Sequence, residues 1–507
     1  MRALKGLLFA LAPLAVLVAG SELLLRALGL GADTVARSRG FDPEAAYLIP
    51  LGDDGAGAPD RWRTQMFDGR NKEFTIRRRQ SGTLRVVLFG GSNTEGFPAW
   101  LLEQMLRQRR GEDAAPVEVI NLGRNGYGSE RVAILFEQAL ALDPDLVLIY
   151  TGHNEFVEKG FRQELDLARE DWHTPLADRA SNLRSFRMMV GALAPAVEPG
   201  GGGGGATPEE WKWEHEKFSR NTHEDMLAQL DRYRANLERM CALGRERGVE
   251  VVFSTVVTNM LAAPFVGTLP PDLPEDSQNE FRRLLREGTR HFPARFLPLV
   301  VPGPMQRPYE VDWQSHGRDP QPFDPPALRT LLGRLSPESS GEEAFWHPPE
   351  GWGDMVRTYV RMLADYHARR LDEDERARLA AGAAKLEQAL RIVPDHPATL
   401  FRLACATWLL EGDGERTAAL LDEAGDRDRA PRRGSRLSND IVREVAAECG
   451  AGLIDAARLY RERSPSGIIG WEIMVDNCHL QPGVKPHLMR DFALFLEPLL
   501  AAREPRP

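Results

Sequence analysis

The sequence is poor in cysteine: its 507 residues include four, Cys241, Cys405, Cys449 and Cys478, and no two of them form a CxxC pair. This spacing indicates neither a zinc site nor a disulfide framework, and no metal or other cofactor is expected. Long basic blocks are lacking as well. Since the net charge is −10 and the basic runs are short, such as that at positions 77–79, we expect no nucleic-acid partner.

The N-terminus lacks an unbroken apolar run of the roughly 20 residues that a membrane-spanning helix needs. After Arg2 and Lys5, an apolar run covers residues 6–20, and apolar character resumes over residues 23–30. We expect residues 1–30 to be an uncleaved signal anchor, with its positive charges inside; a cleaved signal peptide is the alternative. Both interpretations place the bulk of the chain outside the cytoplasm, in the periplasm or extracellular space.

The chain is too long for one compact core and should form several domains. We expect an irregular extension at 31–82, a core domain at 83–372, a helical insertion at 373–427 and the end of the core at 428–507. Two stretches interrupt the core: 161–222, with six consecutive glycines typical of a flexible linker, and the proline-rich 258–347. Each of these two stretches is interpreted either as a lid over a ligand-binding site or as surface packing between domains.

Five apolar stretches indicate strands, at residues 86–89, 117–120, 146–150, 249–257 and 452–455. Helical patterns alternate with them, at 100–110, 129–142, 226–248 and 438–449. This alternation predicts βαβ units and therefore an α/β fold with a parallel sheet. Loops that follow the strands of such a sheet are where ligands bind.

Four short motifs supply chemistry at these loops. They read GGSNTEG around Ser92, NLGRNG around Gly126, TGHNE around Asn154 and DNCH from Asp476 to His479. A serine becomes nucleophilic when a neighbouring imidazole accepts its proton and an acid holds that imidazole in the right tautomer. The amides of Ser92 and Gly126, with the side chain of Asn154, are the expected donors to an oxyanion.

With these motifs in this order, the chain resembles the SGNH (GDSL-like) hydrolase superfamily. The resemblance implies a three-layer α/β/α fold, flavodoxin-like, around a five-stranded parallel sheet. It also implies that Ser92 is the nucleophile, His479 the base and Asp476 its orienting acid, with an oxyanion hole formed by Ser92, Gly126 and Asn154. Two residues depart from the family pattern: Gly91 replaces the usual acidic residue before the serine, and Glu155 replaces an aspartate.

A further pattern lies in the insertion at 373–427. The spacing that ends a tetratricopeptide (TPR) repeat is found at Gly382, Leu386, Ala389 and Pro394. The residues that follow fit the start of a second repeat with the TPR period of about 34 residues. One and a half repeats resemble the insertions of membrane-anchored SGNH proteins. Because a free-standing solenoid needs about three repeats, we expect a helical bulge packed on the core; a groove that binds a protein partner is the alternative.

The sequence thus predicts an exported, membrane-anchored serine esterase that cleaves acyl esters through an acyl-serine intermediate. The expected substrates are acyl esters of a small molecule or a glycan, and O-acetyl groups on a cell-envelope polysaccharide are one candidate. One alternative is an O-acyltransferase that uses the same triad to modify an envelope glycan. The other is a non-catalytic TPR-type scaffold, against which the complete set of Ser, Gly, Asn, Asp and His argues.

Overall fold

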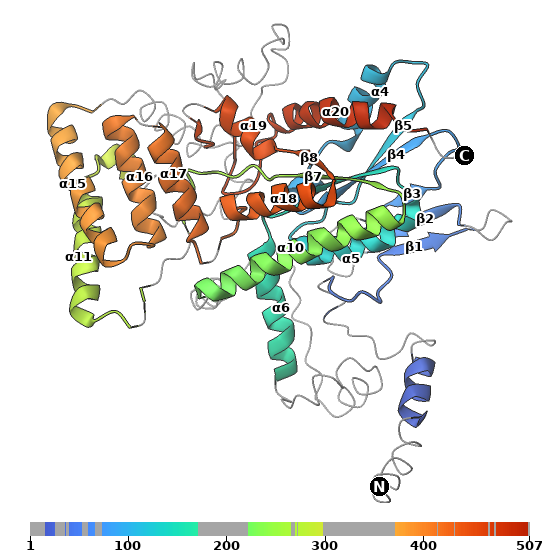
Figure 1. The fold of residues 1–507 in the computed structure, drawn as a ribbon, viewed down its shortest axis with the longest axis horizontal. Helices are drawn as coiled ribbons and strands as arrows, with labels where there is room; N and C mark the ends of the chain where they lie inside the picture. The colour runs from blue at the N-terminus through green and yellow to red at the C-terminus, as the bar shows by residue number, and fades with distance from the viewer. Residues whose placement is uncertain are drawn as a thin grey trace, which may run out of the picture. The chain divides into compact units, whose positions relative to one another are not determined.

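A computed structural model gives the architecture of the chain (Figure 1). It describes residues 16–25, 36, 40–52, 59–65, 73–170, 222–264, 269–270, 272–297, 371–412, 414–429, 431–464, 467–470 and 473–504. Two compact units are present: Met1–Arg77 with Lys159–Lys212, and Arg78–Glu158 with Trp213–Pro507.

The first unit contains a small antiparallel sheet in the order β1-β2-β3. Its strands are β1 (Leu48–Leu51), β2 (Arg61–Thr64) and β3 (Thr75–Arg77). The expectation of irregular structure over 31–82 is therefore wrong for these residues. Trp62 of β2 pairs with Ile76 of β3, and both side chains are buried. The residues on either side of them point to the opposite face. An alternation of only three or four residues is therefore enough for a strand here.

Of the expected signal anchor, residues 16–25 are described, and they are helical. Val16, Leu17, Leu23 and Leu24 on this helix are each more than half exposed. None of the described helices is both long enough and apolar enough to span a membrane. Residues 1–15 and 26–30 of the expected anchor lie outside the described residues.

The second unit is built on a five-stranded parallel sheet with the order β5-β4-β6-β7-β8. The strands are β4 (Leu84–Gly90), β5 (Val117–Asn121), β6 (Leu146–Tyr150), β7 (Glu250–Ser254) and β8 (Gly452–Ile454). Numbered along the core, this order is 2-1-3-4-5, which is the flavodoxin-like arrangement. The expected α/β fold with five parallel strands is thus confirmed.

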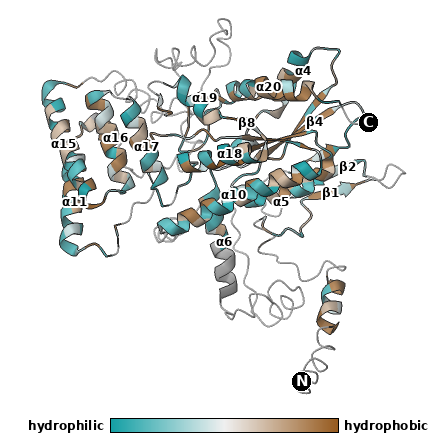
Figure 2. Ribbon diagram, in the orientation of Figure 1, coloured by the Kyte–Doolittle hydropathy of each residue, from teal (hydrophilic) through white to brown (hydrophobic). Residues whose placement is uncertain are grey.

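Helices cover both faces of this sheet, as Figure 1 shows. One layer has α4 (Ala99–Arg110) packed against α20 (Lys485–Ala501), with α19 (Ala456–Arg463) beyond it. The other has α5 (Ser129–Ala139), the 3-10 turn Leu140–Leu142, α10 (His223–Glu246) and α18 (Arg436–Cys449). Figure 2 shows apolar strands between helices whose outward faces are largely polar. Residues of β4 and β6 are fully buried, as is typical of a parallel sheet covered on both faces.

The expected insertion at 373–427 is helical, with α15 (Glu373–Ile392), α16 (Pro397–Glu411) and α17 (Gly414–Asp426). A helix from the preceding stretch joins them: α11 (Glu275–Arg290), followed by the 3-10 turn Ala294–Phe296, packs along α15. A Cβ at Gly382 of α15 would lie 2.8 Å from the carbonyl oxygen of Gly288 in α11, so these two helices meet backbone to backbone. Part of the stretch 258–347 is therefore a packed helix rather than lid-like irregular structure.

Two other expectations lie mostly outside the described residues. The stretch 161–222 is described only up to residue 170, which ends α6 (Glu155–Glu170), and at residue 222, which caps α10. The stretch 258–347 is described at 258–264, 269–270 and 272–297. A lid formed by either stretch stays a prediction.

Candidate active site

Ser92 is the first residue of α3 (Ser92–Glu95), a short helix that follows β4 directly. Two glycines make this turn possible. A Cβ at Gly90 would lie 2.1 Å from the carbonyl oxygen of Tyr150, and one at Gly91 would lie 2.4 Å from the side-chain nitrogen of Asn154. Such separations are far below van der Waals contact. At Gly90 the obstacle is backbone, so only glycine fits there, whereas at Gly91 the side chain of Asn154 would have to move to admit a larger residue.

The structure brings Ser92, His479 and Asp476 together in one chain of hydrogen bonds. Ser92 Oγ lies 2.6 Å from His479 Nε2, and His479 Nδ1 lies 2.7 Å from Asp476 Oδ2. The serine and the histidine are 387 positions apart in the sequence. Because the imidazole contacts a hydroxyl on one side and a carboxylate on the other, it has the geometry of a base held by an orienting acid.

Asp476 is almost completely buried, and its other oxygen is also engaged. Asp476 Oδ1 accepts hydrogen bonds from the backbone amides of Cys478, at 2.8 Å, and His479, at 2.6 Å. Burial acts to raise the pKa of this carboxyl, but the bonds from His479 and from the two amides outweigh it and hold the pKa below its ordinary value. Asp476 is therefore ionised at neutral pH and fixes the orientation of His479.

Two asparagines that the sequence did not single out hold the turn of Asp476 and His479 in place. Asn93 Nδ2 donates to the carbonyl of Cys478 at 2.7 Å, and Asn93 Oδ1 accepts from the amide of Leu480 at 3.2 Å. Asn259 Nδ2 donates to the carbonyl of Asp476 at 2.9 Å. The sole sequence signal was the position of Asn93 directly after the serine, because these bonds join segments that are far apart in the chain.

The expected oxyanion donors lie at the ends of neighbouring strands. In the described part of the chain, the backbone amides of Ser92 and Gly126 donate to no other group. Asn154 Nδ2 donates to the carbonyl of Tyr127 at 2.9 Å and leaves its second hydrogen for another acceptor. Since the Gly91 position is close to both Asn154 and Tyr127, the loops after β4, β5 and β6 meet beside Ser92.

A buried ion pair beneath these loops fixes the segment that contains Gly126. Arg131 Nε lies 2.7 Å from Glu158 Oε1, and the same guanidinium donates to the carbonyl of Gly126. Glu158 also accepts from the amides of Gly128, at 3.0 Å, and Glu130, at 2.9 Å. Sequence reasoning missed this pair, which connects the start of α5 to α6.

Glu155, the second departure from the family pattern, is also buried under this loop. It accepts from the hydroxyl of Ser129 at 2.6 Å and from the amide of the same residue. Burial, and next the neighbouring Glu158, raise its pKa well above the ordinary value. Glu155 therefore supports the loops of the site and does not face the serine and histidine.

His153 precedes Asn154 and is buried close to the same turn. Its Nδ1 accepts a hydrogen bond of 3.0 Å from the amide of Gly434, so in the neutral ring the proton is on Nε2. Among the described residues, Nε2 has no hydrogen-bond partner. Burial, followed by the repulsion of His479, lowers the pKa of His153 to about 3. This imidazole is therefore only weakly basic, and because its lone pair already accepts from Gly434, it is not suited to act as a second base.

Asp476, Cys478 and His479 are spaced closely enough for their donor atoms to reach one ion. Their chemistry does not favour a metal. Burial raises the pKa of the Cys478 thiol well above its ordinary value, whereas a metal binds the thiolate. The imidazole Nδ1 and both carboxylate oxygens are already bonded within the turn. We assign no metal to this cluster.

Comparison with known proteins agrees with this geometry. Residues 88–328 match the model of the GDSL-like Lipase/Acylhydrolase family. The matched range contains Ser92, Gly126 and Asn154, and it ends before Asp476 and His479. No curated protein matches the chain.

Two solved structures are among those similar to the chain, both at 17% sequence identity. A GDSL-like lipase from Bacteroides thetaiotaomicron VPI-5482 has a TM-score of 0.17, with 35% of this chain and 50% of that chain covered. A putative acylhydrolase from Bacteroides fragilis NCTC 9343 has a TM-score of 0.18, with coverages of 41% and 63%. The chain thus spans less than two thirds of either structure. At these TM-scores the likenesses carry no argument about its fold or activity.

Proposed function

We propose, starting from the GDSL-like lipase/acylhydrolase domain that the chain carries, that the protein is a serine esterase acting on acyl esters. The observation that supports this most strongly is the relay from Ser92 through His479 to Asp476, with separations of 2.6 and 2.7 Å. Hydrogen bonds of this length place the hydroxyl proton within direct reach of the imidazole.

In the proposed mechanism, His479 accepts the proton of Ser92 as Ser92 Oγ attacks the ester carbonyl. The amides of Ser92 and Gly126 and the side chain of Asn154 donate to the resulting oxyanion, each contribution being worth about 3–4 kcal/mol of barrier. His479 then protonates the leaving alcohol, which departs and leaves an acyl-serine. A water molecule, deprotonated by His479, attacks this ester; the bond to Ser92 Oγ then breaks, His479 returns the proton to Oγ, and the acid is released. Asp476 stays ionised throughout and stabilises the imidazolium.

We also infer a substrate and a cellular location for the protein. We propose O-acetyl groups on a cell-envelope polysaccharide as substrate, and residues 1–30 as a membrane anchor that holds the catalytic unit outside the cytoplasm. Support for the anchor comes from the exposed apolar side chains of helix 16–25. An O-acyltransferase is the alternative that the same triad allows, since an acceptor hydroxyl would then replace water in the second step.

For the TPR-like insertion we propose packing on the core as its main role, with a protein partner as the alternative. The close approach of Gly288 and Gly382 joins α11 to α15, and α15 in turn packs on α16. Leu386, Phe401 and Leu421 of these helices belong to the same buried cluster as the strands of the sheet.

The test is covalent labelling by a fluorophosphonate probe followed by turnover of a series of p-nitrophenyl esters. Wild type should be labelled and should hydrolyse short acyl chains, whereas Ser92→Ala should lose both properties with little change in melting temperature. Asp476→Asn should lose up to about 10⁴ in kcat, because it favours the wrong imidazole tautomer. His487→Ala, a change eight residues beyond His479, serves as the control and should stay active. Unlabelled wild type, or labelling that survives in Ser92→Ala, would remove this assignment.

A further inference from the structure

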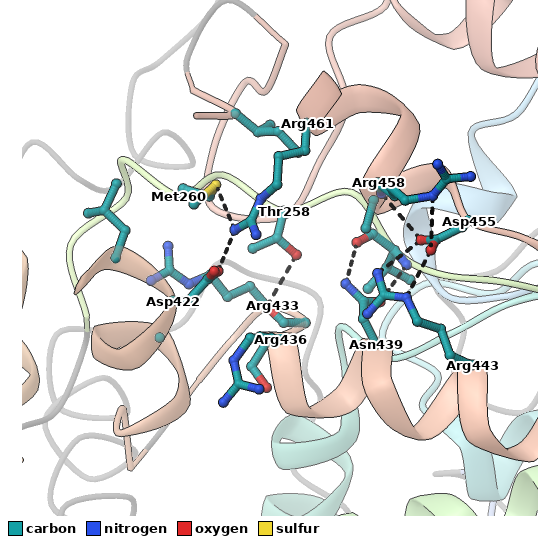
Figure 3. A pocket seen from close by; sticks show the side chains of 17 residues that line it. Thr258, Met260, Asp422, Arg433, Arg436, Asn439, Arg443, Asp455, Arg458 and Arg461 are labelled. Atoms are coloured by element: carbon teal, nitrogen blue, oxygen red, sulfur yellow. Dashed lines mark hydrogen bonds and ion pairs between the residues drawn. The ribbon is translucent and has the colours of Figure 1, made fainter. Parts of the chain in front are cut away.

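A cavity of about 200 Å³ lies beyond the ends of β7 and β8, beside the helical insertion (Figure 3). Its wall comes from the segment after β7, from α17, from α18 and from α19. The side chains that Figure 3 labels there include Met260, Asp422, Asn439, Arg443 and Arg461. Because β7 and β8 both end at this cavity, it lies at the carboxyl edge of the parallel sheet, where such folds bind ligands.

The lining is both charged and apolar. It includes five arginines and two aspartates, which can donate and accept many hydrogen bonds: Arg433, Arg436, Arg443, Arg458, Arg461, Asp422 and Asp455. Between them lie the apolar side chains of Val256, Met260, Leu421, Ala457 and Ile469. A sugar ring has the matching character, since its hydroxyl edge needs donors and acceptors and its C–H faces need apolar contact.

The charged groups are held in place by one another. Arg461 donates to Asp422 Oδ1 at 2.5 Å and contacts the sulfur of Met260, so it joins α19 to α17. Arg443 Nε donates to Asp455 Oδ2 at 2.9 Å. Since each guanidinium has five donor hydrogens, these pairs leave donors for a ligand while fixing the orientation of the planar groups, which lowers the entropic cost of binding.

Hydrogen bonds connect the cavity wall to the site of Ser92 through two intermediate residues, His153 and Asn259. The amide of Gly434, a lining residue, donates to His153, the neighbour of Asn154. Arg433 is buried, and its guanidinium donates to the carbonyls of Asn259 and Ala262. Asn259 in turn holds the carbonyl of Asp476. The cavity therefore shares its supporting residues with both the oxyanion side and the histidine side of the candidate site.

We propose that this cavity is a subsite for one sugar residue of an acylated glycan whose ester is presented to Ser92. The inference rests on the proposed esterase function and names its substrate class. It also gives the insertion a role, because α17 supplies Asp422 and Leu421 to the wall. The competing explanation is that the ion pairs merely attach α17 to the core. That explanation predicts a loss of stability on mutation and no selective effect on glycan substrates.

Arg461→Gln and Arg458→Gln separate the two explanations. Arg458 has 62% of its side chain exposed, so its replacement should leave the fold intact even if Arg461→Gln does not. Arg416→Gln is the matched control: Arg416 lies on α17 and pairs with Glu411, but it is not part of the lining. Steady-state kinetics would be measured on p-nitrophenyl acetate, on acetylated xylan fragments and on acetylated polygalacturonate fragments.

We expect Arg461→Gln and Arg458→Gln to raise KM about tenfold on at least one acetylated glycan, as for a lost hydrogen bond to a charged group. Turnover of p-nitrophenyl acetate should stay within about twofold, and Arg416→Gln should change neither reaction. Equal losses on the aryl ester and the glycans, or unchanged kinetics on both glycans, would overturn the proposal.

A binding measurement keeps this test separate from the esterase assignment. Titration calorimetry on the Ser92→Ala protein would use deacetylated xylohexaose and hexagalacturonate, with the Arg458→Gln change added in a second protein. Binding that weakens with Arg458→Gln supports the subsite even if wild type hydrolyses no ester. Absence of binding by both oligosaccharides overturns the subsite even if p-nitrophenyl acetate is cleaved.

Discussion

The side chain of Asn93 donates to the backbone carbonyl of Cys478 over 2.7 Å and accepts from the amide of Leu480. The residue after the nucleophile thus fixes the turn that carries the base. One side chain thus ties the turn that carries His479 to the residue next to Ser92, which helps to hold the two groups at bonding distance. Asn93 is a positioning residue, because its bonds are to the backbone.

Asn93→Ala should lower kcat on p-nitrophenyl acetate by about 10²-fold, the cost of a displacement of about 1 Å in a catalytic group. KM should change little, since Asn93 is buried and its side chain bonds the turn. Fluorophosphonate labelling should slow in parallel, because it uses the same serine and histidine. Asn121→Ala is a suitable control, since Asn121 Nδ2 donates to the carbonyl of Thr94 in the same region but not to the histidine turn. Equal losses in the two variants would contradict a specific role for Asn93.

The burial of the His153 imidazole should make the stability of the protein depend on pH. In the unfolded chain a histidine takes up a proton near pH 6.5, whereas burial lowers the pKa of His153 in the folded protein to about 3. Between these values the unfolded state binds the additional proton. The contribution of His153 to stability is therefore fully present above about pH 6.5 and is lost as the pH falls toward about 3.

Urea unfolding at a series of pH values would measure this effect. His153→Asn retains an acceptor for the amide of Gly434 but cannot titrate, so its stability should fall less steeply on acidification than that of wild type. His223→Asn, at the exposed start of α10, should keep the wild-type slope. If His153→Asn and wild type had the same slope, the imidazole would not be buried in its neutral form.

Replacement of Lys485 by an apolar residue should stabilise the protein. It begins α20, where the helix dipole disfavours a positive charge, and burial lowers the pKa of its amine. A Cβ at Gly96 would lie 2.5 Å from Nζ, and among the described residues the ammonium makes no hydrogen bond or ion pair. A half-buried charge without a partner opposes folding.

Lys485→Met should therefore raise the melting temperature at pH 7. Its advantage should shrink as the pH rises toward the ordinary lysine value of 10.5, because the wild-type amine loses its charge in the folded state before it does so in the unfolded state, and the cost of burying that charge disappears. Lys385→Met, which removes a lysine that faces Glu287 at 3.8 Å, should not stabilise the protein. Thermal denaturation of the three proteins at neutral and alkaline pH gives the comparison, and a lower melting temperature in Lys485→Met would contradict it.

The sequence predicted the sheet well, because its strands are continuous apolar runs that alternate with helical patterns. It did not predict β1, β2 and β3, whose three or four residues are too short for a clear alternation. Nor did it reveal α11, where charged residues outnumber the buried Phe281 and Leu284. For both elements the tertiary partner, rather than the local pattern, makes the structure stable.

The candidate site, too, could be predicted from the sequence only in part. Ser92, Asp476 and His479 could be singled out because each motif brings its own chemistry within a few residues. The supports could not, since Asn93 and Cys478 are 385 positions apart and Asn259 and Asp476 are 217 apart. Their hydrogen bonds join a side chain to a backbone group, which leaves no complementary residue type for a motif to show.

Gly91 gives the most specific test of the loops around Ser92. Restoring the acidic residue that SGNH proteins usually carry there, by Gly91→Asp, should damage this enzyme. The backbone at Gly91 is extended, with φ of −85°, so an aspartate would cause no backbone strain. The obstacle is space: its Cβ would lie 2.4 Å from Asn154 Nδ2 and 3.0 Å from the carbonyl oxygen of Tyr127.

The atom of Tyr127 near this Cβ belongs to the backbone, so the side chain of Asn154 is the group that must move. Its amide would then leave the position from which we propose that it donates to the oxyanion. Gly91→Asp should therefore reduce kcat on p-nitrophenyl acetate by about 10²–10³, as for the loss of one oxyanion donor, with KM nearly unchanged. Gly91→Ala should give a similar loss, since the clash arises at Cβ and not from the carboxylate. If the alanine variant kept full kcat while the aspartate variant lost it, the effect would be electrostatic. If both variants kept full kcat, Asn154 would not need its present position for catalysis.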